Sequence, residues 1–128
     1  MNNNRNPYAD LLGIQVLEVG KGTARVSARV GAEHINRLGF THGGFIYSVA
    51  DVAFELASNS HDVDAVGLTT SMQFHRATTV GATIEAVAKE THLGKRIATY
   101  HIELFNEHKI IASFTGTVYR KTDDEQER

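Results

Sequence analysis

Alternation of apolar and polar side chains predicts a hairpin in the first quarter of the chain. One strand begins at Ile14, and a second, over residues 24–30, alternates between four apolar and three polar residues. Residues 20–22, Gly-Lys-Gly, supply turn formers between them. A short helical turn over residues 8–12 precedes the hairpin. We expect this hairpin to bury one face and to expose the other.

A strongly apolar segment follows the turn-forming residues 31–41. From Gly43 to about Asn59, apolar residues recur on nearly every side of a helix of about 3.6 residues per turn. A helix that is apolar all round is buried rather than laid on a surface. We therefore expect one central helix, with Asp51 as a charged residue inside it.

The rest of the chain has the pattern of strands. Turn residues divide it into four predicted strands, over residues 65–75, 83–91, 96–106 and 109–121. The links at residues 81–82, 92–95 and 107–108 are short, so consecutive strands should be antiparallel neighbours. Together, the elements predict an α+β fold in which a long antiparallel sheet wraps around one buried central helix.

Length and charge narrow the class of protein. The 128 residues suit a single domain, 1–128, with polar ends at residues 1–7 and 122–128 that should be flexible. A formal net charge of -2 gives no basic excess for binding nucleic acid. The polar N-terminus is not a secretory signal, and no apolar run is long enough to span a membrane. We expect a cytoplasmic protein that binds neither nucleic acid nor membrane.

Composition argues against thiol and metal chemistry. The chain has no cysteine, which excludes a disulfide scaffold, a thiolate metal site and a cysteine nucleophile. Seven histidines are present, but none forms a His-x-His or His-x-x-x-His pair. We therefore expect no metal site and no bound cofactor.

Asp51 is the first candidate for chemistry, because an unpaired charge inside a buried helix is costly. In one interpretation, Asp51 lies on a single solvated edge of the helix or accepts hydrogen bonds from core hydroxyls. In the other, it is a functional acid. Glu55, one turn further along, is either a rival base or a solvated residue at the helix edge.

The tripeptide His42-Gly43-Gly44 at the start of the same helix favours the functional interpretation. The first N–H groups of a helix are unpaired, and the helix dipole is positive there. Two glycines let a phosphate or a developing oxyanion approach the backbone closely. Glycines serve equally often in tight turns, so their conjunction with an acid is the informative feature.

The helix geometry separates these two features. Asp51 follows Gly43 by eight residues, which is roughly 12 Å along the axis at ~1.5 Å per residue. One substrate carbonyl cannot contact both groups of the same helix. If both act on one substrate, they come from two copies, and a homodimer with its helices side by side and antiparallel would form two such sites.

The helix start belongs to a longer motif. It consists of Asn36-Arg37-Leu38-Gly39-Phe40-Thr41-His42-Gly43-Gly44, followed by Ser48-Val49-Ala50-Asp51. This motif resembles the signature of the PaaI-type (phenylacetate-pathway) acyl-CoA thioesterases of the hotdog fold, and the likeness extends over residues 12–120. It implies a long sheet around a central helix and protomers that pair their sheets edge to edge. Such dimers commonly associate into tetramers.

The resemblance also implies roles for single residues. Asp51 matches the catalytic acid, which acts as general base on water or as nucleophile. The Gly43 N–H matches the oxyanion donor, contributed by the other protomer. His42 and Asn36 match residues that orient the thioester and the loop.

A hydroxyl in the strand after the helix often holds the attacking water in this family. Thr69 is the best match, with Thr70 and Ser71 nearby. The chain departs from the family at residues 76–77, which are Arg-Ala where Arg-Pro is frequent. Related hotdog thioesterases carry Glu at the position of Asp51, so the aspartate favours the PaaI-like branch.

Further residues are candidates for binding the substrate. Gly94-Lys95-Arg96, together with Arg76, would hold the phosphates of CoA, because the family places them near basic residues at strand ends. A charged hairpin turn is the alternative. Tyr47 and Phe54, with Gly44 at the helix start, would line the acyl site, and core packing is their alternative role.

These features lead to one expected function and two alternatives. A thioester carbonyl is electrophilic and its thiolate leaves readily, so one carboxylate and one oxyanion donor suffice. We expect an acyl-CoA thioesterase for aromatic (phenylacetyl-type) or short-to-medium acyl groups, active as a homodimer or homotetramer. The alternatives are a hotdog hydratase or dehydratase and a non-catalytic acyl-CoA binding or sensing module.

Overall fold

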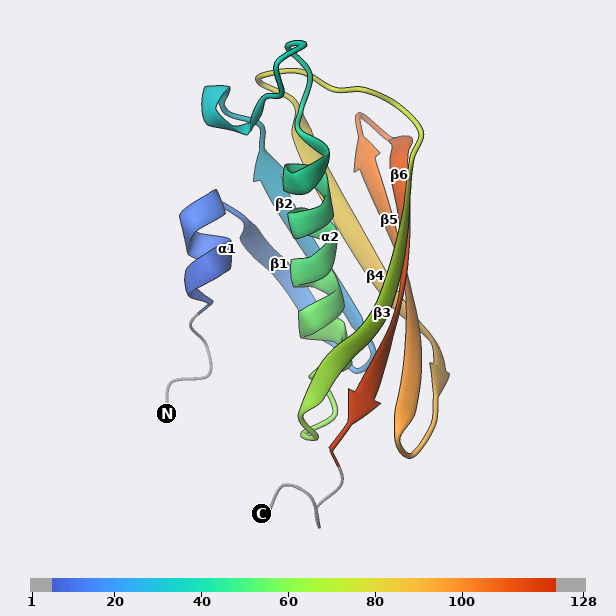
Figure 1. The fold of residues 1–128 in the computed structure, drawn as a ribbon. Helices are drawn as coiled ribbons and strands as arrows, with labels where there is room; N and C mark the ends of the chain where they lie inside the picture. The colour runs from blue at the N-terminus through green and yellow to red at the C-terminus, as the bar shows by residue number, and fades with distance from the viewer. Residues whose placement is uncertain (1–5, 122–128) are drawn as a thin grey trace.

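One curved sheet of six antiparallel strands wraps around the helix α2 (Gly43–Ser58) in the computed structural model, which describes residues 6–121 (Figure 1). The other elements are the helix α1 (Pro7–Leu12), the 3-10 helix η1 (Ala32–His34) and the strands β1 (Gln15–Gly20), β2 (Thr23–Arg29), β3 (Ala65–Phe74), β4 (Thr83–Leu93), β5 (Ile97–Asn106) and β6 (Lys109–Arg120). The expected α+β architecture is confirmed.

Small side chains on the inner face of the sheet let α2 lie close to it. The buried alanines of the strands are Ala24, Ala28, Ala86, Ala88, Ala98 and Ala112. Gly116 of β6 is smaller still, and a Cβ there would lie 2.6 Å from Cζ of Phe54 on α2. The predicted alternation in β2 is confirmed, because Ala24, Val26 and Ala28 are buried. Each large apolar side chain buried in this way contributes about 1.5–3 kcal/mol.

One predicted strand pairing is wrong. The strand order is β1-β2-β4-β5-β6-β3, so β3 is not a neighbour of β4 but pairs with β6 at the edge of the sheet. The link between β3 and β4 is residues 75–82, longer than the turn at 81–82 alone, and it crosses the top of the molecule in Figure 1. Three strand spacings of about 4.8 Å span roughly 14 Å, which an extended segment of this length reaches.

Residues 6 and 7, at the end of the segment predicted to be flexible, form the start of α1. Asn6 caps α1 and Pro7 is its first residue, a position that suits proline because no N–H is needed there. Residues 1–5 and 122–128 lie outside the described residues. The irregular stretch 31–41 contains η1 and an isolated bridge between Ile35 and Thr41. Within residues 6–121, no helix has the length and apolar character needed to cross a membrane.

Candidate active site

The first turn of α2 leaves one backbone donor open. Nδ1 of His42 accepts a hydrogen bond from the Gly44 N–H at 2.9 Å. The His42 carbonyl oxygen accepts from the N–H groups of Phe45 and Ile46 at 3.0 and 3.3 Å. The Gly43 N–H has no hydrogen-bond partner among residues 6–121. It is therefore an open donor at the positive end of the helix dipole, where an oxyanion is stabilised.

The cap also fixes the proton of the His42 side chain. Because Nδ1 accepts a hydrogen bond, a neutral imidazole carries its proton on Nε2. That Nε2–H is a second donor at the helix start. Glycine at position 44 makes room for the cap, since a Cβ there would lie 3.1 Å from His42 Nδ1.

A cavity of about 330 Å³ opens beside Gly43. Its lining comes from the loop before α2, the start of α2 and the end of β3, namely Asn36, Phe40, Thr41, Gly43, Ile46, Phe74, His75, Arg76 and Ala77. A Cβ at Gly43 would lie 3.3 Å from Cζ of Phe74, so a side chain there would narrow the approach to the open N–H. Gly44 therefore leaves room for the His42 cap, whereas Gly43 leaves room for a ligand to reach its own N–H.

Asn36 organises the loop that leads to this cavity. Its Oδ1 accepts hydrogen bonds from the N–H groups of Leu38 and Phe40, at 2.9 and 3.1 Å. Its own N–H donates to the Phe40 carbonyl oxygen at 2.7 Å. Because Asn36 also lines the cavity, the side chain that shapes the loop lies beside the substrate's approach to Gly43.

Asp51 lies on a solvated edge of α2, in agreement with the expectation that apolar residues cover nearly every side of this helix but not all of it. Gly44, Asp51 and Glu55 are exposed, and Tyr47 is half-buried. These positions follow one another at intervals of three and four residues, which places them on one face of a helix. The interpretation of Asp51 as an edge residue is therefore correct for the single protomer.

A second cavity, of about 320 Å³, opens beside Asp51. It is lined by Asp51, Phe54, Glu55, Ser58, Asn59, Ala65, Val66, Gly67 and Val118. Although Asp51 is exposed, the atoms that surround its carboxyl in the cavity partly desolvate it and raise its pKa, and the negative charge of Glu55 raises that pKa further. Both effects make Asp51 a better proton acceptor than an ordinary aspartate.

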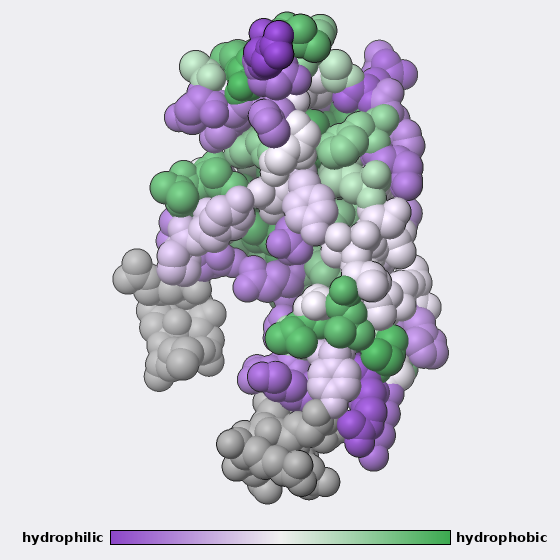
Figure 2. Space-filling view, viewed as in Figure 1, coloured by the Kyte–Doolittle hydropathy of each residue, from purple (hydrophilic) through white to green (hydrophobic). Residues whose placement is uncertain are grey.

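Gly43 and Asp51 line different cavities in the protomer, as the helix geometry predicts. Both cavities border the edge strand β3, one at its last residues and the other at its first. Figure 2 shows apolar surface near both ends of this strand. The exposed apolar side chains of β3 are Val66, Leu68 and Phe74.

The hydroxyl predicted to hold water, that of Thr69, does not face α2. Thr69 lies opposite Thr117, on the outer face of the sheet. Thr70 lies opposite Gly116, on the face that covers α2, and its Oγ1 is 2.8 Å from the Tyr47 hydroxyl. Of the three hydroxyls considered, Thr70 is thus the one next to the stripe that carries Asp51. Ser71 lies on the outer face, like Thr69.

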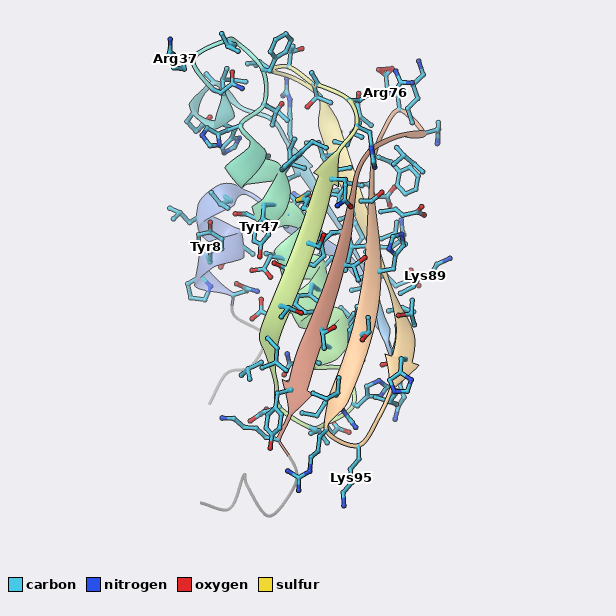
Figure 3. The ribbon with its side chains drawn as sticks, turned by 45° about the vertical axis from the view of Figure 1, so that its right-hand side comes forward. Tyr8, Arg37, Tyr47, Arg76, Lys89 and Lys95 are labelled. Atoms are coloured by element: carbon cyan, nitrogen blue, oxygen red, sulfur yellow. The ribbon has the colours of Figure 1, made fainter. Side chains whose placement is uncertain are left out.

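The basic candidates do not form one cluster in the protomer. Arg76 lies past the end of β3, and Lys95 lies in the turn at the opposite end of the sheet (Figure 3). Arg120 holds this turn, since its Nη1 donates to the carbonyl oxygens of Gly94 and Lys95 at 2.8 and 3.3 Å. Nη1 of Arg96 donates to the Tyr119 hydroxyl at 3.2 Å.

The two aromatic candidates differ in role. Phe54 is buried against Tyr100 and Phe114, so core packing is its main role, although its ring reaches the cavity beside Asp51. Tyr47 lies on the exposed stripe, with its ring 5.4 Å from that of Phe114. For metals, residues 6–121 contain no group of three or more His, Asp or Glu side chains that could hold an ion.

The sequence pattern did not predict the contacts of α1 with α2. The hydroxyls of Tyr8 and Ser48 are 2.8 Å apart, and Nδ2 of Asn6 donates to Oε1 of Glu55 at 2.9 Å. Asn-Pro at residues 6–7 is a recognisable helix start. Nothing local to it, however, indicates which face of α2 it contacts.

A family model and several known proteins match this chain. A family model described as the thioesterase superfamily matches residues 38–112. Acyl-coenzyme A thioesterase PaaI of Escherichia coli (strain K12) is 36% identical over 113 residues, which are 88% of this chain and 81% of that protein. The TT0310 protein from Thermus thermophilus is 46% identical, with a TM-score of 0.89 over 91% of this chain and 98% of that one.

A mutant of the phenylacetic acid degradation protein PaaI from Thermus thermophilus is similar in structure as well. It is 44% identical, with a TM-score of 0.88 over 90% of this chain and 99% of that one. The family match covers more than half of this chain and contains the whole of α2. The chain therefore belongs to the thioesterase superfamily, as a PaaI-type member with the hotdog fold and the activity of a thioester hydrolase.

Proposed function

We propose that the protein hydrolyses acyl-CoA thioesters at a site shared by two protomers, with Asp51 of one and the Gly43 N–H of the other acting on the same carbonyl. The observation that carries this proposal is the open Gly43 N–H in one cavity and the proton-accepting Asp51 in another. The similarity to acyl-coenzyme A thioesterase PaaI of Escherichia coli supports an acyl-CoA substrate.

The position of β3 supports the shared site. It pairs with β6 on one side only, and its other edge is unpaired among residues 6–121. Antiparallel pairing of two β3 strands centred near Thr70 would bring residues 65–67 of one copy opposite residues 73–75 of the other. The Asp51 cavity of one protomer would then join the Gly43 cavity of its partner.

The same two-fold arrangement would unite the basic candidates. Ala65 at the start of β3 pairs with Arg120, which in turn holds the turn containing Lys95. Arg76 of the second copy would approach this end of the sheet. Together they would face the anionic phosphates of CoA near the mouth of the joined cavities.

In the proposed reaction, the Asp51 carboxylate takes a proton from water as the water oxygen attacks the thioester carbon. The carbonyl oxygen becomes an oxyanion, which accepts a hydrogen bond from the Gly43 N–H. Collapse of this intermediate breaks the C–S bond and releases the carboxylic acid and the CoA thiolate. The thiolate takes up the proton held by Asp51, which restores the carboxylate. Direct attack by Asp51, giving an anhydride that water cleaves, is the other route.

Three neighbouring groups would assist. The His42 Nε2–H would donate to the thioester, and Asn36 would hold its loop against the substrate. Thr70 takes the role first given to Thr69, because its hydroxyl faces α2 next to Tyr47. Phe40 and Phe74 in one cavity and Phe54 in the other suit an aromatic or short-to-medium acyl group.

Thiol release from a panel of phenylacetyl-, hydroxyphenylacetyl- and straight-chain acyl-CoA esters tests this function. We expect turnover of at least one ester and loss of at least about a hundredfold in kcat with Asp51→Asn. Binding of acyl-CoA without turnover would favour a sensing module. Full activity of Asp51→Asn would disprove the proposed chemistry.

A further inference from the structure

The N-terminal helix α1 contacts α2 on both sides of Asp51. Toward the start of α2, the hydroxyls of Tyr8 and Ser48 are 2.8 Å apart, and Ser48 Oγ donates to the Gly44 carbonyl oxygen at 2.9 Å. Toward its end, Nδ2 of Asn6 donates to Oε1 of Glu55 at 2.9 Å. In Figure 3, Tyr8 and Tyr47 lie on the same side of α2. Along α2, Asp51 therefore lies between Ser48 and Glu55, which are each hydrogen-bonded to the N-terminal segment.

Asn6 holds Glu55 with a side chain that is itself fixed. Its Oδ1 accepts from the Ala9 N–H at 3.2 Å as the cap of α1, while its Nδ2 donates to Glu55. Pro7 sets the backbone of the first turn. The exposed Glu55 carboxylate is therefore held in one position instead of sampling many rotamers in solvent.

The group that donates a hydrogen bond to Glu55 is the uncharged amide of Asn6. Asn6 is neutral, so its hydrogen bond does not cancel the charge of Glu55. Glu55 lies one turn from Asp51 on the same helix face. The negative charge of Glu55 therefore adds to the effect of desolvation and raises the pKa of the Asp51 carboxyl.

The other surroundings of Asp51 contribute no charge. Besides Asp51 and Glu55, the cavity is lined by neutral residues of α2, the segment after it, β3 and β6, namely Phe54, Ser58, Asn59, Ala65, Val66, Gly67 and Val118. β3 has no titratable side chain, and the Tyr8 hydroxyl of α1 is bonded to Ser48. Asp10 of α1 lines a different cavity, with Arg29 and Glu33. Among residues 6–121, Glu55 is the charge that acts on Asp51.

We propose that Glu55 is a positioning residue for the reaction and that Asn6 acts through it: the fixed Glu55 carboxylate holds negative charge beside Asp51 and favours transfer of the proton from water to Asp51. This inference rests on the proposed function, because it takes Asp51 as the group that accepts the proton. It assigns no direct contact with the substrate to either residue.

The pH profile of kcat/KM tests this role in thiol-release assays with the best acyl-CoA ester. Activity requires ionised Asp51, so it rises with pH through the pKa of Asp51. Removing the Glu55 charge lowers that pKa, and Glu55→Gln should move the rising limb to lower pH by about half to one unit. The plateau should fall about two- to fivefold, because a weaker base transfers the proton less well.

Two further variants test the part of Asn6. Asn6→Ala should move the limb in the same direction by a smaller amount, and Asn6→Ala/Glu55→Gln should coincide with Glu55→Gln alone. Tyr8→Phe is the matched control, because it removes the other contact of α1 and leaves Asn6 and Glu55 in place. We expect no displacement of its pH profile.

The outcomes separate this inference from the proposed function. An inactive Asp51→Asn together with a Glu55→Gln profile that coincides with wild type would overturn the role of Glu55 alone. Loss of turnover at every pH in a folded Glu55→Gln would make Glu55 a catalytic residue and also overturn it. A shift in Tyr8→Phe equal to that in Asn6→Ala would show that any loosening of α1 suffices. A fully active Asp51→Asn would remove the proposed function itself.

Discussion

Nδ1 of His42 accepts the Gly44 N–H at 2.9 Å, and this single bond leaves Gly43 as the open donor of the helix start. His42 therefore caps the helix with Nδ1 and leaves Nε2–H as a free donor. The two roles can be separated by substitution, because asparagine caps a helix well but has no donor in the place of Nε2.

We predict that His42→Ala lowers the free energy of unfolding by about 1 kcal/mol and that His42→Asn leaves it nearly unchanged. Both should lower kcat/KM by about tenfold or more, because both remove the Nε2–H donor. Urea unfolding and thiol release measure the two effects. If His42→Asn retained full activity, His42 would serve only as a cap.

Close packing of Phe54 on Gly116 predicts a strong size limit at that glycine. A Cβ at position 116 would lie 2.6 Å from Phe54 Cζ and 3.0 Å from Phe114 Cε1. Gly116→Ala should therefore destabilise the fold by about 1–3 kcal/mol through overpacking. Gly67→Ala is the control, since its Cβ would lie 3.6 Å from Phe54 Cε2, an ordinary contact. Equal midpoints in urea unfolding for the two variants would contradict this account.

A hydrogen-bonded cluster of Glu90, Tyr100 and His61 predicts that the fold loses stability in acid. Oε2 of Glu90 accepts from the buried Tyr100 hydroxyl at 2.6 Å and lies 2.6 Å from Nε2 of His61. Burial alone would raise the pKa of Glu90. The two hydrogen bonds, together with the charges of His61 and Arg120, outweigh burial and hold that pKa below its usual value. Its stabilising contribution is present above the unfolded-state pKa and is lost as pH falls through the lower folded-state pKa.

Glu90→Ala should cost about 1–3 kcal/mol near neutral pH, because it leaves the Tyr100 hydroxyl unsatisfied. Glu90→Gln, which still accepts a hydrogen bond, should cost less. Urea unfolding across the acid range should show the difference between Glu90→Gln and wild type shrinking as pH falls. A difference that stays constant with pH would mean that the charge of Glu90 contributes nothing.

Much of the fold follows from the sequence pattern, because inner-face positions alternate with outer ones along most of β2, β4, β5 and β6. In β3 the alternation is interrupted at the candidate site. Gly67 faces α2, and regular alternation would make Thr69 face it as well. A bulge between Gly67 and Thr69 inserts one residue and turns Thr70 inward instead. No local signal in a run of hydroxyl residues marks that bulge.

The site could be predicted where its residues are close in sequence and not where they meet through the fold. His42, Gly43 and Asp51 share one helix, so the rise per residue alone separates them. The bond from Asn6 to Glu55 joins residues 49 positions apart, and the packing of α1 on α2 decides it. The pairing of β3 with β6 depends likewise on the link over residues 75–82, which is long enough to connect β3 at the edge of the sheet to β4.

The raised pKa of Asp51 predicts a cost in stability. The folded state binds this proton more tightly than the unfolded state, so stability falls as pH rises from the unfolded-state pKa through the higher folded-state pKa. Asp51→Asn removes this dependence and should be more stable than wild type above that window, although it is inactive. Thermal unfolding of both proteins across the acid-to-neutral range measures this difference in stability. Identical pH profiles for the two proteins would contradict the raised pKa.

If the site is shared, two variants that are each inactive should regain activity when they form mixed dimers. Gly43→Pro removes the open N–H and keeps Asp51. Proline suits the first helical position, and the backbone of His42, at φ -64 and ψ 135, is compatible with a following proline. Asp51→Asn keeps Gly43 and removes the acid. In a mixed dimer, one of the two sites combines Asp51 of the first variant with Gly43 of the second, and the other site lacks both.

Equal amounts of the two variants, unfolded together in urea and refolded, should therefore regain about a quarter of wild-type activity, since half of the dimers are mixed and each has one intact site. Each variant refolded alone is the control and should stay inactive. Size-exclusion chromatography of the same samples checks that dimers form. Refolded mixtures that contain dimers but are no more active than their parents would show that Asp51 and Gly43 do not meet across the two copies.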